Sequence, residues 1–377
     1  MIIFFKIYHW LKKIIRFFSS RFKSTVHGKA EWMSYVEMLE FLPKNNQGLV
    51  LSAKHRLSLE DSFKNLALVA PTGSGKTTKF VIPNILNCKG SIVVTDPAGE
   101  IYKLTSGHMA RRGYQIQVLQ PSNLEASLFF NPLSYATSPQ ELKQLANTIG
   151  GQNTGDEPYW KTGAINIIYI CLQALMSQPD PARRNLGELR KLLNEFGVNG
   201  ENINGFMQEH LDDRTFSEYK SFLAKDSKLI TSFISTAEVA LDLWSDSEIV
   251  KFSSQNNVDI PALRKEKTII YLIIPEDKVR YFAIMLNLFY SACFEHCIKN
   301  PQGNPVFFFL DEFGNLPPIA NFATMTTTLR KRKCSISLIL QALSQLETVY
   351  GRTEAQTILT GGDFKQALFF RLGFGDL

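Results

Sequence analysis

The chain has 377 residues, of which 45% are hydrophobic and 20% are charged, and its formal net charge at pH 7 is +6. The length allows two or three globular domains with buried cores. Residues 1–29 hold seven basic side chains and no acidic one, whereas the rest of the chain has 34 basic and 35 acidic residues. This distribution excludes a uniformly basic protein. The odd number of five scattered cysteines is typical of reduced thiols and argues against a disulfide framework.

Residues 1–23 alternate large apolar side chains with lysine and arginine. No uncharged run in this segment approaches the roughly 20 residues that a membrane-spanning helix needs. At 100° per residue, most of the basic side chains fall on one face of a helix and most of the apolar ones on the other. The pattern predicts a basic amphipathic helix at the surface of an anionic membrane. Packing against the protein itself or a partner subunit is the alternative.

Residues 70–77 read Ala-Pro-Thr-Gly-Ser-Gly-Lys-Thr and stand between an apolar run and a helix-forming segment. Glycines let successive backbone N–H groups surround a phosphate chain, while Lys76 reaches the β and γ phosphates and the Thr77 hydroxyl binds Mg²⁺. The first glycine of the usual pattern is replaced by Ala70. We expect the phosphates of ATP to be bound by Thr72, Gly73, Ser74, Gly75, Lys76, Thr77 and Thr78.

Short apolar runs alternate with helical patterns along much of the chain, which is typical of a parallel α/β sheet. The runs expected to form strands are 66–70, 91–95, 115–119, 268–274, 306–310 and 335–340. Helices are expected from Lys76, near 100–112 and from Asp277 to about Ile298.

Between about 135 and 262 the strand series is interrupted by helical periodicity with breakers such as 179–181. An apolar run at 165–176 is too short to span a membrane and predicts a buried helix. We therefore predict an all-helical domain inserted into the α/β domain. The predicted division is an amphipathic segment at 1–23, the first part of the α/β domain at 24–134, the helical domain at 135–262 and the second part at 263–377.

Two carboxylates, Asp311 and Glu312, directly follow the apolar run at 306–310. Parallel sheets bind ligands at the carboxyl ends of their strands, so this position suits a site opposite the phosphates. We expect Asp311 to hold Mg²⁺ and Glu312 to act as the general base that polarises the attacking water. A charged residue that merely opens a loop is the alternative for Glu312.

Several short sequence motifs follow one another along the chain, and their order is informative. They are HGKAEW at 27–32, APTGSGKTTKFVIPNIL at 70–86, SIVVTDPAGEIY at 91–102, FNPL at 130–133, YWKTGA at 159–164, FFFLDEFGNLPPI at 307–319, QALSQL at 341–346 and YG at 350–351. Together they make the chain resemble the TraG-like type IV coupling proteins, the hexameric DNA-pumping ATPases of conjugation and type IV secretion.

This resemblance implies a RecA/FtsK-like P-loop motor domain that carries an all-alpha domain facing the cytoplasm. It implies ATP and Mg²⁺ as cofactors and a homo-hexamer at the cytoplasmic face of the inner membrane. DNA with its attached relaxase is the implied cargo, and the components of a type IV secretion channel are the implied partners.

The resemblance also implies roles for two residues. Gln341, at the end of the run at 335–340, matches a polar sensor of the nucleotide, although a glutamine without that role is the alternative. Arg330 matches an arginine offered to the nucleotide of the neighbouring subunit, where it stabilises charge on the transferred phosphoryl group. A solvated basic run, or a contact to the DNA backbone, is the competing interpretation for Arg330.

The chain departs from this family pattern at three places. Residues 96–100 read Asp-Pro-Ala-Gly-Glu where similar proteins have lysine at the third position. The two transmembrane helices with which the family usually begins are replaced by the amphipathic segment. From about Asp363 onward the residues no longer follow the family pattern, which predicts a truncated C-terminus and a motor sheet that is incomplete on one side.

The sequence therefore predicts an ATPase that couples a DNA–relaxase substrate to a secretion channel. A nucleotide-binding substrate receptor, or an inactive truncated remnant, is the first alternative. A coupling ATPase that moves protein effectors instead of DNA is the second.

Overall fold

The computed structural model describes residue 42 and residues 47–151, 158–196, 200–316, 318–361, 364 and 366–369. The chain divides into two units, residues 1–43 and 44–377, and every element described below belongs to the second. The amphipathic helix predicted at 1–23 lies outside the described residues. None of the described helices is both long enough and apolar enough to cross a membrane.

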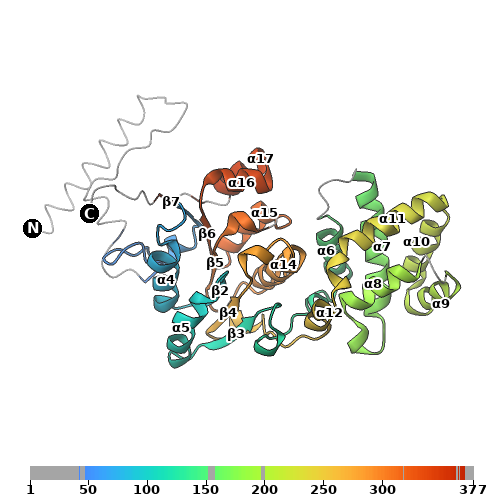
Figure 1. The fold of residues 1–377 in the computed structure, drawn as a ribbon, viewed down its shortest axis with the longest axis horizontal. Coiled ribbons are helices and arrows are strands. Elements are labelled where there is room, and N and C mark those ends of the chain that lie inside the picture. Colours follow the sequence, from blue (N-terminus) through green and yellow to red (C-terminus); the bar gives the residue numbers. More distant parts are fainter. Residues whose placement is uncertain are drawn as a thin grey trace, which may run out of the picture. The chain divides into compact units, whose positions relative to one another are not determined.

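A parallel sheet forms the centre of the second unit (Figure 1). Its strand order is β3-β4-β2-β5-β6-β1-β7, and every recorded pair is parallel. The strands are β1 (Leu66–Val69), β2 (Ser91–Thr95), β3 (Gln115–Leu119), β4 (Thr268–Leu272), β5 (Val306–Leu310), β6 (Cys334–Leu340) and β7 (Gln366–Phe369). The first six match the predicted runs, except that β6 begins one residue earlier than predicted, at Cys334. Most of them are buried along their whole length, as expected of a sheet covered on both faces.

Strand β7 is not among the predicted strands. It pairs in parallel with β1, from Gln366 opposite Leu66 to Phe369 opposite Val69. The truncation of the C-terminus stays a prediction, but the predicted strands lack this one. The prediction failed because β7 is short and its partner stands at the other end of the unit in sequence, so no local pattern encodes the pairing.

Helices cover both faces of the sheet, because right-handed crossovers run in two directions from its centre. One face is covered by α4 (Ile82–Asn87), which continues the π-helical turn η1 (Thr77–Val81), and by α5 (Glu100–Arg111). The other is covered by α14 (Ala283–Lys299), α15 (Phe322–Arg330), α16 (Leu343–Tyr350) and α17 (Arg352–Gly361). Two short helices, α3 (Leu59–Ser62) and α13 (Ala262–Lys265), lie before β1 and β4 in sequence.

The described residues between β3 and β4 form helices and turns, and no β-strand occurs among them. We call residues 139–254 the helical segment. Its helices are α6 (Pro139–Gly150), α7 (Pro158–Met176), α8 (Leu186–Glu195), α9 (Gly200–His210), α10 (Asp213–Leu223), α11 (Ser227–Ala240) and α12 (Ser247–Ser254). The apolar run at 165–176 lies within α7, where Ile167, Ile168 and Cys171 are fully buried.

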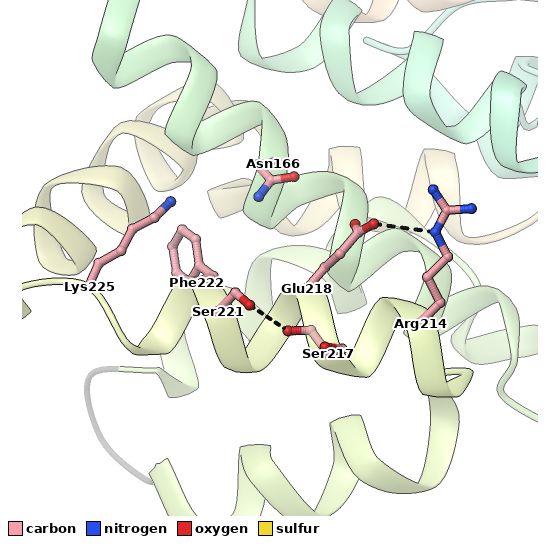
Figure 2. A pocket seen from close by; sticks show the side chains of 7 residues that line it. All are labelled: Asn166, Arg214, Ser217, Glu218, Ser221, Phe222 and Lys225. Carbon is pink, nitrogen blue, oxygen red and sulfur yellow. Dashed lines mark hydrogen bonds and ion pairs between the residues drawn. The ribbon is translucent and has the colours of Figure 1, made fainter.

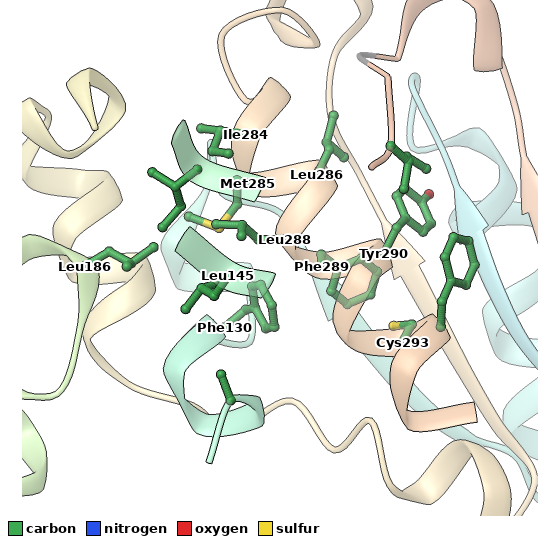
Figure 3. Packing of buried hydrophobic residues seen from close by; sticks show 14 of the residues in the cluster. Phe130, Leu145, Leu186, Ile284, Met285, Leu286, Leu288, Phe289, Tyr290 and Cys293 are labelled. Carbon is green, nitrogen blue, oxygen red and sulfur yellow. The ribbon is translucent and has the colours of Figure 1, made fainter. Parts of the chain in front are cut away.

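Helix α14 joins the core of the sheet to the core of the helical segment (Figure 3). Phe294 of α14 packs on Phe308 of β5 with ring centroids 4.9 Å apart. Nearer the start of α14, Phe289 packs edge-on against Phe130 at 5.4 Å. A helix that is apolar on all sides is typical of a buried position. Since one apolar cluster spans both parts, the domain boundaries near 135 and 262 stay predictions.

Candidate nucleotide-binding site

Three loops meet at one edge of the sheet, where β5, β6 and β1 lie side by side. Because the strands are parallel, their carboxyl ends lie at the same edge, where such sheets bind ligands. The loop after β1 carries Lys76 and Thr77, the loop after β5 carries Asp311 and Glu312, and Gln341 follows β6. The structure thus brings together five residues that the sequence analysis places in one site.

The loop between β1 and η1 depends on two glycines with left-handed backbone angles. The φ angles of Gly73 and Gly75 are 76° and 83°, a conformation that other residues adopt only with strain. A side chain at Gly73 would meet nothing within 4 Å, so the loop is open on that side. The helical turn that begins at Thr77 follows directly. Strand, glycine loop and helix start therefore form the predicted phosphate-binding loop.

Lys76 is buried within this loop, with only 7% of its surface exposed. Its Nζ donates a hydrogen bond of 2.9 Å to the backbone oxygen of Ala70 and lies 3.7 Å from Oε1 of Glu312. A buried ammonium needs such partners because burial removes its hydration. The lysine is therefore held at the mouth of the loop by contacts that a phosphate oxygen can replace.

Thr77 and Asp311 contact each other across the site. The Thr77 hydroxyl donates a hydrogen bond of 2.8 Å to Oδ2 of Asp311. Burial raises the pKa of Asp311 to about 6, and the charge of Glu312 adds to this effect. The Thr77 hydrogen bond and the charge of Lys76 act in the opposite direction. Burial makes the negative charge of the Asp311 carboxylate unfavourable, and a cation would offset this cost. The carboxylate and the Thr77 hydroxyl are therefore two oxygen ligands suited to a hard cation.

Glu312 has an unusual backbone conformation, with φ 53° and ψ 39°. Successive residues of a strand point to opposite faces, so an extended backbone would separate its side chain from that of Asp311. The left-handed turn lets Asp311 contact Thr77 while Glu312 lies near Lys76. A left-handed non-glycine residue costs about 1–2 kcal/mol and persists only where its surroundings hold it. The strain is therefore located at the residue predicted to be the general base.

Gln341 completes the site from the loop after the neighbouring strand, β6. Its Nε2 donates a hydrogen bond of 3.0 Å to Oε2 of Glu312. The predicted sensor thus contacts the predicted general base directly. Gln345, which is absent from the predicted site, accepts a hydrogen bond of 2.8 Å from the backbone N–H of Gln341. The only sequence signal for Gln345 is its position in the QALSQL string, one helical turn after Gln341.

The structure does not bring Arg330 into this site. Arg330 ends α15, and the chain then leads into the amino end of β6. The amino ends of parallel strands lie at the edge of the sheet opposite the site. Arg330 therefore does not serve the nucleotide site of its own subunit, and its role in a neighbouring subunit stays a prediction.

The residues around the loop fit a nucleotide phosphate chain and Mg²⁺. The Ser74 hydroxyl is buried and has no hydrogen-bond partner among the described residues, while Thr72 is exposed. The Thr78 hydroxyl donates to the backbone oxygen of Gly75 at 3.3 Å. No cluster of three or more histidine, cysteine, aspartate or glutamate side chains suited to a metal occurs among the described residues. The pair of Thr77 and Asp311 is enough for Mg²⁺, which usually keeps several waters and phosphate oxygens as ligands.

The departure at residues 96–100 lies at the end of β2. Asp96 is buried, and its carboxylate accepts hydrogen bonds from the backbone N–H groups of Ile101 and Tyr102, at 3.3 and 2.8 Å. These bonds satisfy donors in the first turn of α5 that have no partner within the helix. Ala98, at the position of the missing lysine, is exposed. Asp96 therefore stabilises the start of α5.

A hollow lies in the helical segment, and none of its lining residues belongs to the phosphate-binding loop (Figure 2). Its volume is about 580 Å³, and it lies between α7 and α10. Its lining residues are Asn166, Arg214, Ser217, Glu218, Ser221, Phe222 and Lys225. Arg214 and Glu218 form an ion pair of 3.7 Å, and no residue of the nucleotide site takes part. The hollow is therefore separate from the nucleotide site.

Comparison with known proteins gives related sequences over most of the chain. Residues 30–368 match the family described as type IV secretory system conjugative DNA transfer. Protein VirD4 of Rhizobium radiobacter is 27% identical over 306 residues, which cover 78% of this chain and 44% of VirD4. The conjugal transfer protein TraG of Agrobacterium fabrum (strain C58 / ATCC 33970) is 22% identical over 394 residues, covering 88% of this chain and 57% of TraG. The chain spans about half the length of these relatives.

Solved structures of the coupling protein TrwB have a similar fold. The plasmid coupling protein TrwB in complex with ADP and Mg²⁺ has a TM-score of 0.72 at 16% identity, covering 89% of this chain and 76% of the TrwB chain. The conjugative coupling protein TrwBdeltaN70 in complex with sulphate gives the same TM-score and identity, covering 92% of this chain and 80% of the other.

The phosphate-binding loop, the paired carboxylates and the parallel sheet define an α/β P-loop protein whose fold is similar to that of TrwB. The chain belongs to the type IV secretory system conjugative DNA transfer family. This membership confirms the predicted resemblance to the TraG-like coupling proteins.

Proposed function

We propose that this protein hydrolyses ATP and uses the energy to pump DNA, with its attached relaxase, into a type IV secretion channel. The observation that carries the proposal is the chain of contacts from Thr77 and Lys76 to Asp311, Glu312 and Gln341. Membership of a conjugative DNA transfer family supports DNA as the cargo.

In the proposed mechanism, residues 72–78 bind the phosphates of ATP through backbone N–H groups and through Nζ of Lys76. Thr77 and Asp311 would hold Mg²⁺, which would supply positive charge against the negative charge of the phosphates. The raised pKa of Asp311 supports this role, because a divalent cation stabilises the charged carboxylate that burial disfavours.

Glu312 is the proposed general base for the attacking water. Binding of a phosphate by Lys76 competes with the 3.7 Å contact between Lys76 and Oε1 of Glu312. The released oxygen then accepts a hydrogen bond from water and takes its proton as the water oxygen bonds to the γ phosphorus. The bond from the γ phosphorus to the bridging oxygen breaks, and ADP leaves with that oxygen while phosphate is released. Gln341 donates to the other oxygen, Oε2, and so holds the orientation of the carboxylate.

Arg330 supplies the proposed contact between subunits. Its position beyond the amino end of β6 keeps it from the site of its own subunit, so it is proposed to act on the nucleotide of a neighbour. A closed ring, proposed to be a homo-hexamer, gives each site one such arginine. The basic segment at 1–29 supports a position at the cytoplasmic face of the inner membrane.

The test is ATP hydrolysis by the purified chain over a series of protein concentrations, with and without DNA, beside the variant Lys76→Ala. The proposal predicts turnover that depends on Lys76, increases with added DNA and rises more than proportionally with protein concentration. Nucleotide binding without turnover would instead identify a substrate receptor. Turnover per subunit that is independent of concentration would remove the proposed role of Arg330.

A further inference from the structure

We infer that Gln345 is a positioning residue for ATP hydrolysis, which acts through Gln341 on Glu312; this inference rests on the proposed ATPase activity. Gln345 lies in the first turn of α16, and Gln341 lies between the end of β6 and the start of this helix. Three contacts connect it to the two loops that hold Glu312.

The first contact fixes the backbone between β6 and α16. Oε1 of Gln345 accepts hydrogen bonds from the backbone N–H groups of Gln341, at 2.8 Å, and of Ala342, at 3.3 Å. The N–H groups at the start of a helix have no partner within the helix, and the side chain of Ala342, at the N-cap position, offers no acceptor. Gln345 therefore supplies the acceptor that holds Gln341 at the turn.

The second contact continues from Gln341 to the proposed general base. Nε2 of Gln341 donates to Oε2 of Glu312 at 3.0 Å. The direction of the Gln341 side chain depends on the orientation of the Gln341 backbone, and the hydrogen bond to Gln345 fixes that backbone. Loss of the Gln345 acceptor therefore shifts the group that orients Glu312.

The third contact reaches the loop of Glu312 from the other side. A Cβ atom at Gly314 would lie 2.6 Å from Cδ of Gln345 and 2.7 Å from its Oε1. The turn η7 (Phe313–Asn315) therefore packs its backbone directly on the Gln345 side chain. Gly314 is needed for space, since its φ is outside the left-handed region. Gln345 thus touches both loops that hold the left-handed backbone of Glu312.

The test compares two substitutions of nearly equal size. Gln345→Leu removes the acceptor, whereas Gln345→Glu keeps an oxygen for the N–H groups of Gln341 and Ala342. With the full chain, Mg²⁺ and ATP, we expect Gln345→Leu to lower kcat about tenfold or more, with ATP affinity changed less than about threefold. Gln345→Glu should restore kcat to within about threefold of the wild type. Equal losses in both variants, or a loss of affinity without a loss of kcat, would overturn the inference.

Two further measurements separate positioning from a purely structural role. In the background of Gln341→Ala, adding Gln345→Leu should lower kcat by less than about twofold, because residues that act as a unit are not additive. Amide hydrogen exchange at Gln341 and Ala342 should quicken in Gln345→Leu but not in Gln345→Glu. If the wild type is active but amide exchange in Gln345→Leu is the same as in the wild type, the inference about Gln345 is overturned and the proposed function is not. A wild type without Lys76-dependent turnover overturns the proposed function, and with it the role of Gln345.

Discussion

The carboxyl edge of the sheet and the helical segment use polar side chains in opposite ways. In the helical segment, side chains at helix starts accept hydrogen bonds from the backbone of their own helix, as in Asn185, Asp212, Asp226 and Asp246. At the carboxyl edge, Lys76, Asp311 and Glu312 contact side chains from other loops. A cap stabilises one helix, whereas contacts between loops can be exchanged for contacts to a ligand. The proposed site therefore lies where contacts can be exchanged, whereas the capping side chains of the helical segment stabilise single helices.

The largest expected effect is the loss of nucleotide binding in Lys76→Ala. Removal of the buried ammonium should weaken binding of Mg²⁺–ATP about 100-fold or more, because a charge-assisted contact to phosphate is lost in a site shielded from water. Titration with a fluorescent ATP analogue measures the change. The matched control is Lys251→Ala, which removes an exposed lysine from α12 and should leave binding unchanged. Equal affinities of Lys76→Ala and the wild type would contradict the assignment of the site.

A smaller effect, confined to stability, is expected for Gly163→Ala in α7. A Cβ atom there would lie 2.1 Å from the ring of Phe233, so α7 and α11 would have to separate. Overpacking of this kind costs about 1–3 kcal/mol of unfolding free energy, which chemical denaturation measures. Nucleotide affinity of the folded protein should stay unchanged.

The matched control for this substitution is Gly205→Ala in α9, where the added Cβ would meet nothing within 4 Å. That variant should be more stable than the wild type by about 0.5–1 kcal/mol, because alanine favours a helix interior more than glycine does. Equal stability changes in the two variants would contradict the close contact between α7 and α11.

The smallest effect is expected for Glu141→Gln, which weakens the link between α6 and α14. Glu141 accepts from the backbone N–H of Ser138, in a capping box, and pairs with Lys299 of α14. Burial alone would raise the pKa of Glu141, but the contact with Lys299 and the hydrogen bonds from the backbone N–H groups of Ser138 and Thr137 lower it to about 2. At pH 7 the substitution should cost about 1 kcal/mol of unfolding free energy.

The pH dependence of this cost follows from the lowered pKa. The stability that the charged Glu141 contributes is present above the ordinary pKa of 4.5 and is lost as the pH falls towards about 2. The difference between Glu141→Gln and the wild type should therefore narrow across this interval in urea denaturation curves. A difference that stays constant down to pH 2 would show that the charge of Glu141 has no part in it. Glu125→Gln, at an exposed position, is the control and should cost nothing measurable.

Much of the α/β fold and of the candidate site could be predicted because the relevant signals are local. Strands buried on both faces must be continuous apolar runs, and β5 (Val306–Leu310) is such a run. The phosphate-binding loop needs glycines beside Lys76, so its spacing identifies it. Asp311 could be placed because parallel strands end at one edge.

The features that could not be predicted depend on contacts between distant segments. Strand β7 pairs with β1, from which most of the chain separates it. The role of Gln345 depends on a side chain that reaches back four residues and on the backbone of Gly314. The domain boundaries near 135 and 262 have no sharp sequence signal, because one apolar core continues through α14.

The most direct test of the proposed site is a single turnover of ATP by Glu312→Gln. The variant should bind Mg²⁺–ATP within about threefold of the wild-type affinity. Because glutamine cannot take a proton from water, its rate of ATP cleavage should be lower than that of the wild type by about 100-fold or more. Cleavage at the wild-type rate by Glu312→Gln would contradict the assignment of Glu312 as the general base at the carboxyl edge of the sheet.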